Sequence, residues 1–195
     1  MIEFLEKEHI YLKDGMIVPS VSEILSFIFP DKYKDVPKQI LNKKADYGTK
    51  VHESIEKLEK DGKLDISNLS IHQKIAIEQY IKLKNKFNIK VLEQEQMVSY
   101  SYDFCGRFDM IAYVDGKKCL CDIKTTAKFD FEYLSWQLSF YELAYGEIFD
   151  NLFAIWLPKK DLGQLIKIER KNRKELFSKI EEFKKHKERI KNERS

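Results

Sequence analysis

The sequence predicts an α/β (α+β) fold in which helices flank a mixed central β-sheet. Helical spacing of apolar residues dominates the chain up to about residue 87. From Val91 to about Thr125 the pattern changes to β-strands, and a long helical stretch then separates these strands from two later ones. This order of elements is typical of a mixed sheet covered by helices.

The first predicted elements are a hairpin and a short helix. Residues 8–19 place Asp14-Gly15 between apolar-rich arms, and this dipeptide favours a type I′ turn. Ser20 is followed three residues later by Glu23, which is the spacing of a capping box at the start of a helix. Pro30 should end that helix, because proline cannot continue it.

Two further helices are predicted before the sheet. The first covers about residues 37–60 and should stop at Asp61-Gly62. The second covers about residues 70–87 and begins with a Ser70/Gln73 capping box. The apolar positions expected along this second helix are Ile71, Ile75, Ile77, Tyr80 and Ile81.

The remaining elements are predicted to form the sheet and the helices around it. Asp115-Gly116 lies between two apolar-rich stretches and indicates a second tight hairpin. A basic amphipathic helix closes the chain. The expected strands are residues 91–100, 105–114, 117–125, 151–157 and 164–169, and the expected helices are residues 131–149 and about 171–192.

Composition narrows the class of protein. The 195 residues suit a single domain, and a content of 43% hydrophobic and 34% charged residues excludes collagen-like, low-complexity and disordered classes. Apolar runs fall short of the roughly 18 residues of a membrane span, and the acidic N-terminus lacks the basic start of a signal peptide. We therefore expect a cytoplasmic protein without a membrane partner. The three cysteines lack C-x-x-C spacing, so we expect reduced core residues rather than disulfides or a zinc or iron–sulfur site.

Charge is unevenly distributed along the chain. Residues 159–195 contain 14 Lys and Arg against 7 Asp and Glu, whereas the rest of the chain is net negative. Such a stretch is usually the solvated face of a helix, and nucleic-acid binding is the alternative interpretation. The basic segment therefore supports a nucleic-acid function only together with other features.

The turn at Asp115-Gly116 predicts the register of its hairpin. With a two-residue turn, one face of the two strands is apolar and should be buried. The other face places Asp109 directly opposite Asp122, and like charges in opposed positions destabilise a sheet. The pairs expected on the apolar face are Phe108 with Ile123, Met110 with Cys121, and Ala112 with Cys119.

The charges of Asp109 and Asp122 require compensation, and two interpretations are open. The two carboxylates could converge on one divalent cation, since Mg²⁺ prefers oxygen ligands. Alternatively, Arg107 and Lys124 form diagonal surface ion pairs with them, each worth about 0 to 1 kcal/mol. Lys124 shares a strand face with Asp122, so its ammonium could hold or deprotonate a water and stabilise charge on a phosphoryl oxygen.

Two of the predicted helices carry further candidate residues. Gln137 and Tyr141 are spaced i,i+4, so both project from one helix face, where they could hold a phosphate or a base. The alternative is a packed ring and a glutamine that satisfies the backbone. His52 follows Gly48 in the helix at 37–60, with Glu56 one turn later, and taken alone such a histidine is more often an ordinary surface or core residue.

Four segments, taken in order, resemble the motifs of one enzyme superfamily. They are Gly48–His52 as G-x-x-x-H, Gly106–Asp109 as G-x-x-D, Asp122–Lys124 as D-x-K, and Gln137–Tyr141 as Q-x-x-x-Y. This set resembles the PD-(D/E)XK nuclease superfamily, in its RecB-like and phage lambda-exonuclease-like branch. Residues 11–25 also resemble the leader of small phage-type members, so the resemblance covers about residues 8–145. Phe108 replaces the proline of the eponymous P-D.

The resemblance implies a restriction-endonuclease-like core at about residues 45–157 of a single nuclease domain, residues 1–195. It implies one or two Mg²⁺ or Mn²⁺ ions and, since the cysteines do not match the iron–sulfur members, no iron–sulfur cluster. Glu95 stands near a further acidic position of some members and is left unassigned. The implied catalytic residues are Asp109, Asp122 and Lys124, the implied metal ligands are His52, Asp109, Asp122 and the backbone carbonyl of Ile123, and the implied DNA-positioning residues are Gln137 and Tyr141.

The activity implied by the resemblance is metal-dependent hydrolysis of DNA phosphodiester bonds by an exonuclease. Its substrates would be single strands or duplex ends in phage-type recombination, replication or repair, with a single-strand annealing or binding protein as partner. An endonuclease of the same superfamily is the nearest alternative. A catalytically silent DNA-binding module is the alternative from another class, and RNA stays open as a substrate because no segment recognisably reads a 2′-hydroxyl.

Overall fold

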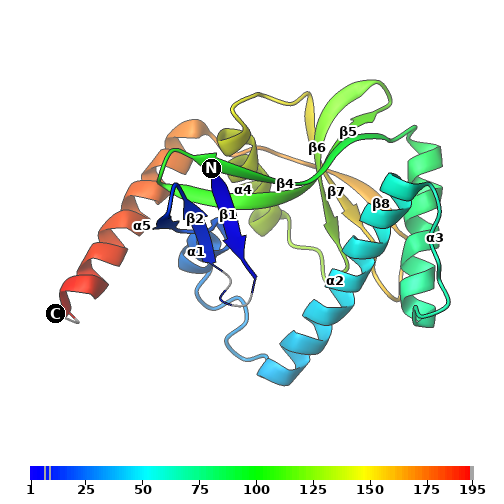
Figure 1. The fold of residues 1–195 in the computed structure, drawn as a ribbon, viewed down its shortest axis with the longest axis horizontal. Coiled ribbons are helices and arrows are strands. Elements are labelled where there is room, and N and C mark those ends of the chain that lie inside the picture. The colour runs from blue at the N-terminus through cyan, green and yellow to red at the C-terminus, as the bar shows by residue number, and fades with distance from the viewer. Residues whose placement is uncertain (7, 9, 194–195) are drawn as a thin grey trace.

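A five-stranded mixed sheet lies at the centre of the molecule, with helices on both of its faces (Figure 1). The structure is a computed structural model and describes residues 1–6, 8 and 10–193. The strands β6 and β7 are parallel and connected by α4 (Phe131–Tyr145), whereas the other neighbours are antiparallel. The predicted fold class is confirmed. In spatial order the strands are β4 (Lys90–Tyr100), β5 (Phe104–Val114), β6 (Lys117–Lys124), β7 (Asn151–Trp156) and β8 (Gln164–Ile168).

A second, three-stranded sheet forms at the N-terminus from β1 (Ile2–Leu5), β2 (Ile10–Lys13) and β3 (Met16–Val18). The predicted hairpin is confirmed for β2 and β3, whose turn at Asp14-Gly15 has positive φ angles of 50° and 79°. Residue 9 of the predicted hairpin lies outside the described residues. The strand β1 is an addition to the prediction, because its four residues carry too short a pattern.

The capping signals in the sequence locate the helices well. Both predicted capping boxes form, at the starts of α1 (Val21–Ile28) and α3 (Ile71–Lys86). Helix α2 (Lys38–Asp61) ends as predicted, and α5 (Arg173–Glu193) closes the chain. Helix α4 is shorter than the predicted span to residue 149, because Gly146 takes a left-handed conformation with φ 86° and ends it.

The buried face of α3 differs from the prediction. Ile71 and Ile81 are exposed, whereas Ile77 and Tyr80 are buried as expected. The two isoleucines lie on the solvent side of the helix, and the buried face includes Gln73 and Ala76, which the apolar pattern did not mark. The buried residues of α3 are Gln73, Ala76, Ile77, Tyr80 and Leu83.

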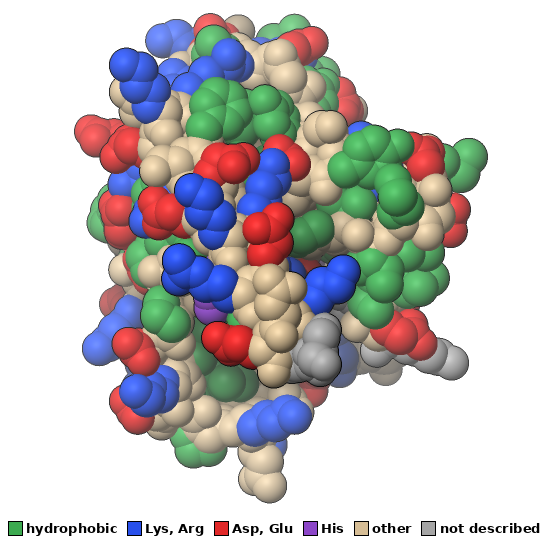
Figure 2. All heavy atoms as spheres, turned by 90° about the vertical axis from the view of Figure 1, so that its left-hand side faces the viewer, with side chains coloured by type: hydrophobic (Ala, Val, Ile, Leu, Met, Phe, Trp, Pro, Cys, Tyr) green, Lys and Arg blue, Asp and Glu red, His purple; other side chains and the backbone are tan. Residues whose placement is uncertain are grey.

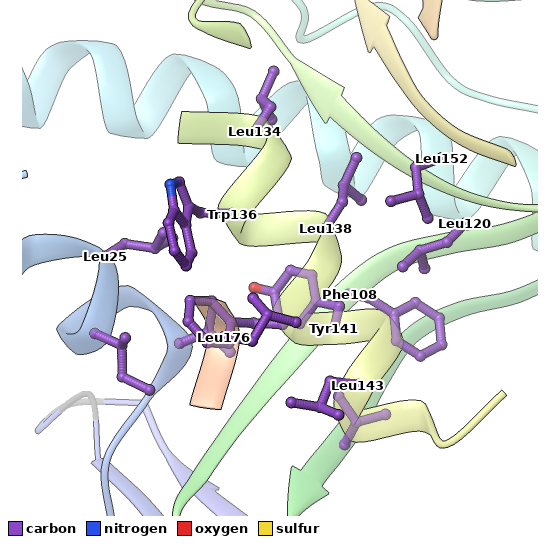
Figure 3. Packing of buried hydrophobic residues seen from close by; sticks show 14 of the residues in the cluster. Leu25, Phe108, Leu120, Leu134, Trp136, Leu138, Tyr141, Leu143, Leu152 and Leu176 are labelled. Carbon is purple, nitrogen blue, oxygen red and sulfur yellow. The ribbon is translucent and has the colours of Figure 1, made fainter. Parts of the chain in front are cut away.

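Two apolar clusters hold the helices against the sheet. The first joins α1, α4 and α5 to one face of the sheet, and Figure 3 shows Leu138 and Tyr141 of α4 among its members. The second joins α2 and α3 to the other face. Cys119 and Cys121 belong to this second cluster as buried free thiols, as expected.

The register of the β5–β6 hairpin is confirmed from the turn to the middle of the strands. It runs from the pair Val114–Lys117 to the pair Met110–Cys121. Beyond that pair the backbone ladder between the strands ends. The Ile123 N–H instead donates a hydrogen bond of 2.6 Å to the side-chain carboxylate of Asp109. The two strands therefore open where the two acidic residues lie.

Strand β5 changes faces at the same place. Phe108 packs in the cluster around α4, with its ring 5.9 Å from that of Tyr145, whereas Met110 packs in the cluster of α2 and α3. The prediction that Phe108 shares one buried face with Met110 and Ile123 is therefore wrong. The physical reason is an irregularity in both strands, since Glu95 of β4, facing this point, has a positive φ of 51°.

The basic helix α5 is less basic at its surface than its composition indicates. Lys179, Lys184 and Lys187 each form an ion pair with a carboxylate. Figure 2 shows this side of the molecule, where Lys and Arg side chains are interspersed with Asp and Glu. Within the part of the chain that the structure describes, no helix combines the length and the apolar character needed to cross a membrane.

Candidate active site

Side chains from α2, β4 and β5 converge where the β5–β6 hairpin opens. The His52 Nδ1 and Asp109 Oδ1 atoms are 3.5 Å apart. A carboxylate oxygen of Glu95 completes a group of three ligand atoms that all lie within 4.8 Å of one another. One imidazole and two carboxylates at this spacing are a donor set that could hold a divalent cation.

Glu95 is the residue of this group that the sequence did not assign. Its left-handed backbone, with φ 51°, is uncommon for a residue other than glycine and indicates local strain. Its carboxylate also forms an ion pair of 3.0 Å with Arg107. Arg107 therefore pairs with Glu95, and the predicted diagonal pair of Arg107 with an aspartate is wrong. The pairing of β4 with β5 sets Glu95 opposite Asp109, since the flanking pairs Gln94–Met110 and Gln96–Phe108 keep one register.

Asp122 and Lys124 form the second half of the site, on β6. Their side chains form an ion pair of 2.6 Å, and Asp122 is only 1% exposed. This pair is buried rather than lying on the surface. Apart from the Lys124 ammonium beside Oδ2, neither carboxylate oxygen of Asp122 has a hydrogen-bond partner among the described residues. A buried carboxylate normally accepts several hydrogen bonds, so this one has acceptor capacity left for a ligand.

The electrostatics distinguish the two aspartates. Burial, aided by the nearby Asp109 charge and opposed by Lys124, raises the pKa of Asp122 to about 6. Burial also disfavours ionised Asp109, but the His52 charge, Lys124 and the Ile123 N–H outweigh it and lower the pKa of Asp109. The extra proton of the acidic pair is therefore held by Asp122.

The other two titratable groups are also perturbed by Asp109. Burial opposes the charged imidazole of His52, but the Asp109 carboxylate outweighs burial and raises the pKa of His52. Burial and the Asp109 charge together raise the pKa of Glu95 to about 7. The carboxylates of this group repel one another, so some of them hold protons more tightly than usual. A bound cation would offset this negative charge.

Two glycines of the sequence motifs allow close contacts around the site. A Cβ on Gly106 would lie 2.6 Å from Cε1 of Tyr141, so only glycine lets that ring rest on β5. A Cβ on Gly48 would lie 3.3 Å from Oγ1 of Thr125, the residue after Lys124. Gly48 therefore brings α2, and with it His52, close to the end of β6.

Gln137 and Tyr141 lie on the face of α4 that is turned toward the sheet. Tyr141 is 6% exposed and packs with Phe108 and Leu138 (Figure 3). Burial raises the pKa of the Tyr141 hydroxyl far above its ordinary value; a hydrogen bond with Gln137 opposes this, and the charges of Asp109 and Asp122 add to it. The hydroxyl therefore stays protonated near the two acids. The Gln137 Oε1 atom is buried without a hydrogen-bond partner among the described residues.

The residues present fit a divalent cation such as Mg²⁺ or Mn²⁺. The fit rests on the buried Asp122 carboxylate, which has no hydrogen-bond partner among the described residues other than the Lys124 ammonium, and on the clustered donor atoms of His52, Glu95 and Asp109. All of the residues that the sequence predicted for catalysis and metal binding lie at this one place on the sheet. Glu95 is added to them by the structure.

Comparisons with known proteins add little to this description. No family model matches the chain, and no curated protein matches it. Among solved structures, the crystal structure of SSO0001 is similar at a TM-score of 0.38 and 16% identity, over 67% of this chain and 68% of that chain. A likeness at this level is too low to assign a fold or an activity.

Proposed function

We propose that this chain is a metal-dependent nuclease that hydrolyses phosphodiester bonds in DNA, acting as an exonuclease. The observation that supports it most is the buried Asp122–Lys124 pair, in which the carboxylate has no hydrogen-bond partner among the described residues other than the Lys124 ammonium. A structural ion pair would saturate those oxygens, because unsatisfied buried acceptors cost about 1 to 3 kcal/mol. These oxygens lie beside His52, Glu95 and Asp109, so a bound cation could use the remaining acceptor capacity of Asp122.

The proposed metal ligands are the side chains of His52, Asp109 and Asp122 and the carbonyl of Ile123, with Glu95 as an additional ligand. When bound, Mg²⁺ or Mn²⁺, as one or two ions, lowers the pKa of a water and offsets negative charge at phosphorus. The Asp109 side chain keeps its orientation through the Ile123 N–H. His52 approaches the other oxygen of the same carboxylate.

Lys124 is the proposed catalytic residue that acts on the reacting water. Its ammonium lies beside Asp122 with 22% of the side chain exposed, so it can reach a substrate while remaining attached to the site. It donates a hydrogen bond to the attacking water and stabilises charge on a phosphoryl oxygen. Water attacks phosphorus in line while the bond to one ester oxygen breaks. The attacking water gives up one proton to solvent and the leaving oxygen takes up one from solvent, so the products are a phosphate monoester and a free hydroxyl. Gln137 and the protonated Tyr141 hydroxyl orient the scissile phosphate.

The chain offers a matched control for Lys124. Lys84 also pairs with a largely buried carboxylate, that of Glu59, but on the other side of the sheet. End-labelled single-stranded, blunt duplex and closed circular DNA are incubated with Mg²⁺, Mn²⁺ or EDTA. We expect metal-dependent loss of linear DNA only. Lys124→Ala should reduce the rate by about a thousandfold, as expected for a group that stabilises the transition state, and Lys84→Ala should not.

The other outcomes identify the alternatives. Cleavage of closed circles would make the protein an endonuclease with the same chemistry. Salt-sensitive DNA binding without cleavage would indicate the silent binding module. That module would depend on the basic α5, and the pairing of Lys179, Lys184 and Lys187 with acids makes this helix a weak binding surface. Undiminished cleavage by Lys124→Ala would refute the assignment of Lys124.

The biological setting is part of the same proposal. An exonuclease of this kind serves DNA recombination, replication or repair in the cytoplasm, or in the host cytoplasm if a phage encodes it. A single-strand annealing or binding protein is the proposed partner, because digestion of one strand of a duplex exposes the other. Co-purification with and without DNA ends would test that partnership.

A further inference from the structure

Aromatic rings gather at the carboxyl ends of β6 and β7, directly beside Lys124. Trp156 is paired with Lys124 in the parallel register of these strands, so the two side chains project from the same face of the sheet. The Trp156 indole N–H donates a hydrogen bond of 2.7 Å to the Thr126 carbonyl, which fixes the ring. A tryptophan held in this way presents a rigid ring face next to the proposed catalytic lysine.

Two phenylalanines extend this ring surface outward. Phe129 packs edge to face on Trp156 at 5.5 Å and on Phe131 at 4.6 Å. Phe131, the first residue of α4, is 59% exposed. Phe129 thus holds the Phe131 ring in place, while much of Phe131 remains exposed to solvent.

Tyrosines lie on another side of Lys124. Burial raises the pKa of the Tyr33 and Tyr133 hydroxyls, the latter to about 12, and the Lys124 charge partly offsets the effect on both. Lys32 connects the two tyrosines, since its ammonium lies 3.7 Å from the centre of the Tyr133 ring and pairs with Asp130. Tyr33 is 51% exposed. We call Tyr33, Phe129, Phe131 and Trp156 the aromatic patch.

Exposed lysines are close to the aromatic patch along the chain. Lys128 precedes Phe129 in the chain and is exposed, and Lys159 and Lys160 follow closely after Trp156 and are exposed as well. Lys159 lies 3.7 Å from the centre of the Tyr47 ring, on α2. Rings that alternate with lysines complement a strand with flat bases and a charged backbone, whereas a purely apolar partner would not match the lysines.

We propose that the aromatic patch stacks unpaired bases and so makes single-stranded DNA the preferred substrate of the site. This inference rests on the proposed nuclease function. In a duplex, each base already stacks on its neighbours inside the helix, so its faces are not free for protein rings. An unpaired strand offers base faces to Phe131 and Trp156 while its phosphate reaches Lys124, which is paired with Trp156 on the same face of the sheet.

The binding experiment separates stacking from simple charge attraction. The probes are an oligothymidine and an abasic oligonucleotide of equal length, which has the same phosphates but no bases, and both are measured in EDTA to prevent cleavage. The wild-type protein should prefer oligothymidine, and Phe131→Ala should weaken its binding by about tenfold, the value of one lost stacking contact. Phe131→Tyr should retain tight binding, because it keeps the ring.

A matched control is available on another helix. Phe177 of α5 is 40% exposed and packs against Tyr100, so Phe177→Ala removes a similar ring that is not part of the patch. This variant should bind both oligonucleotides like the wild type. Quenching of Trp156 fluorescence by oligothymidine, absent with the abasic strand and in Trp156→Phe, would show stacking directly.

The outcomes separate this inference from the proposed function. Equal binding of the two oligonucleotides by the wild type, or unchanged binding by Phe131→Ala, overturns the stacking role. If the protein cleaves duplex DNA faster than single strands, and cleavage still depends on Lys124, the proposed substrate preference is overturned. The proposed nuclease function is then supported. Base-dependent binding in a protein that cleaves no DNA supports the stacking surface and overturns the nuclease.

Discussion

Two acid–lysine pairs among the described residues have a carboxylate that is more than nine-tenths buried, and they differ in what else these carboxylates bind. Glu59 pairs with Lys84 and also accepts a hydrogen bond of 2.9 Å from the Tyr80 hydroxyl. Asp122 pairs with Lys124 alone and is the more deeply buried of the two acids. The first pair is satisfied by the fold itself, whereas the second is not.

This difference separates an ion pair that the fold satisfies from one that has capacity left for a ligand. Burying a carboxylate costs free energy that only hydrogen bonds and charge partners restore. At Glu59 the protein supplies both kinds of partner. At Asp122 the protein supplies one cation, Lys124, and places a second acid, Asp109, nearby. The free-energy cost of burying the Asp122 carboxylate therefore remains until a ligand binds. Four predictions test this difference, in order of decreasing effect on the free energy of unfolding.

Metal binding should stabilise the protein through one pair and not the other. At a concentration about a hundredfold above the dissociation constant, Mg²⁺ or Mn²⁺ should add about 3 kcal/mol to the free energy of unfolding, a rise in Tm of roughly 5 to 10 °C. Thermal unfolding with and without metal measures this. The shift should disappear in Asp122→Asn and persist in Glu59→Gln. An unchanged Tm of the wild type at millimolar metal would contradict the proposed site.

Neutralising the two acids should have opposite effects on stability without metal. Glu59→Gln should lower the free energy of unfolding by about 1 to 3 kcal/mol, because it removes a charge-assisted interaction with Lys84. Asp122→Asn should leave it unchanged or raise it at pH 7, since the amide resembles the protonated acid that burial favours. Urea unfolding in EDTA gives both values. A larger loss for Asp122→Asn than for Glu59→Gln would mean that the Lys124 pair is structural.

The stability of the metal-free protein should depend on pH through Asp122. The pKa of Asp122 is about 6 in the folded protein, and that of an aspartate in an unfolded chain is about 3.9, so between these values the folded state holds more protons. The free energy of unfolding should therefore fall as pH rises from about 4 to 6, by about 1 to 2 kcal/mol. The difference between wild type and Asp122→Asn across this range isolates the effect. A difference that stays constant with pH would place the proton elsewhere.

The smallest effect on stability is expected at Gly48. Alanine at this helical position gains helix propensity, up to about 1 kcal/mol, but its Cβ presses on Oγ1 of Thr125 at 3.3 Å. The two effects should nearly cancel, so Gly48→Ala should unfold within about 0.5 kcal/mol of the wild type. Cleavage should nevertheless fall severalfold, because Lys124 adjoins the displaced Thr125. Full activity in this variant would show that the contact is not needed to position Lys124.

Much of the fold follows from local signals in the sequence. The capping boxes at Ser20 and Ser70 and the Asp-Gly turns work through neighbouring residues, so they could be located without knowing the tertiary structure. The predicted site residues also come together, because period-two alternation places Asp122 and Lys124 on one strand face. These signals act over a few residues and are hard to override.

The parts that the sequence did not reveal depend on contacts between distant segments. Phe108 changes faces because β4 and β5 are irregular at Glu95, and an irregular pairing leaves no mark in the alternation of one strand. Helix α3 turns Ile71 and Ile81 outward because its orientation is set by packing on α2 and the sheet. Glu95 itself reaches His52 only once the strands are paired.

The β5–β6 hairpin also has a consequence for the order of folding. Its turn is local, so the hairpin can close within microseconds, whereas His52 must arrive from α2, which α3 and β4 separate from the hairpin along the chain. In that interval Asp109 and Asp122 approach each other without the imidazole that later balances them. We therefore expect the nascent hairpin to remain open at its acidic end until α2 docks, which makes helix docking the slow step and the candidate site the last part of the sheet to assemble.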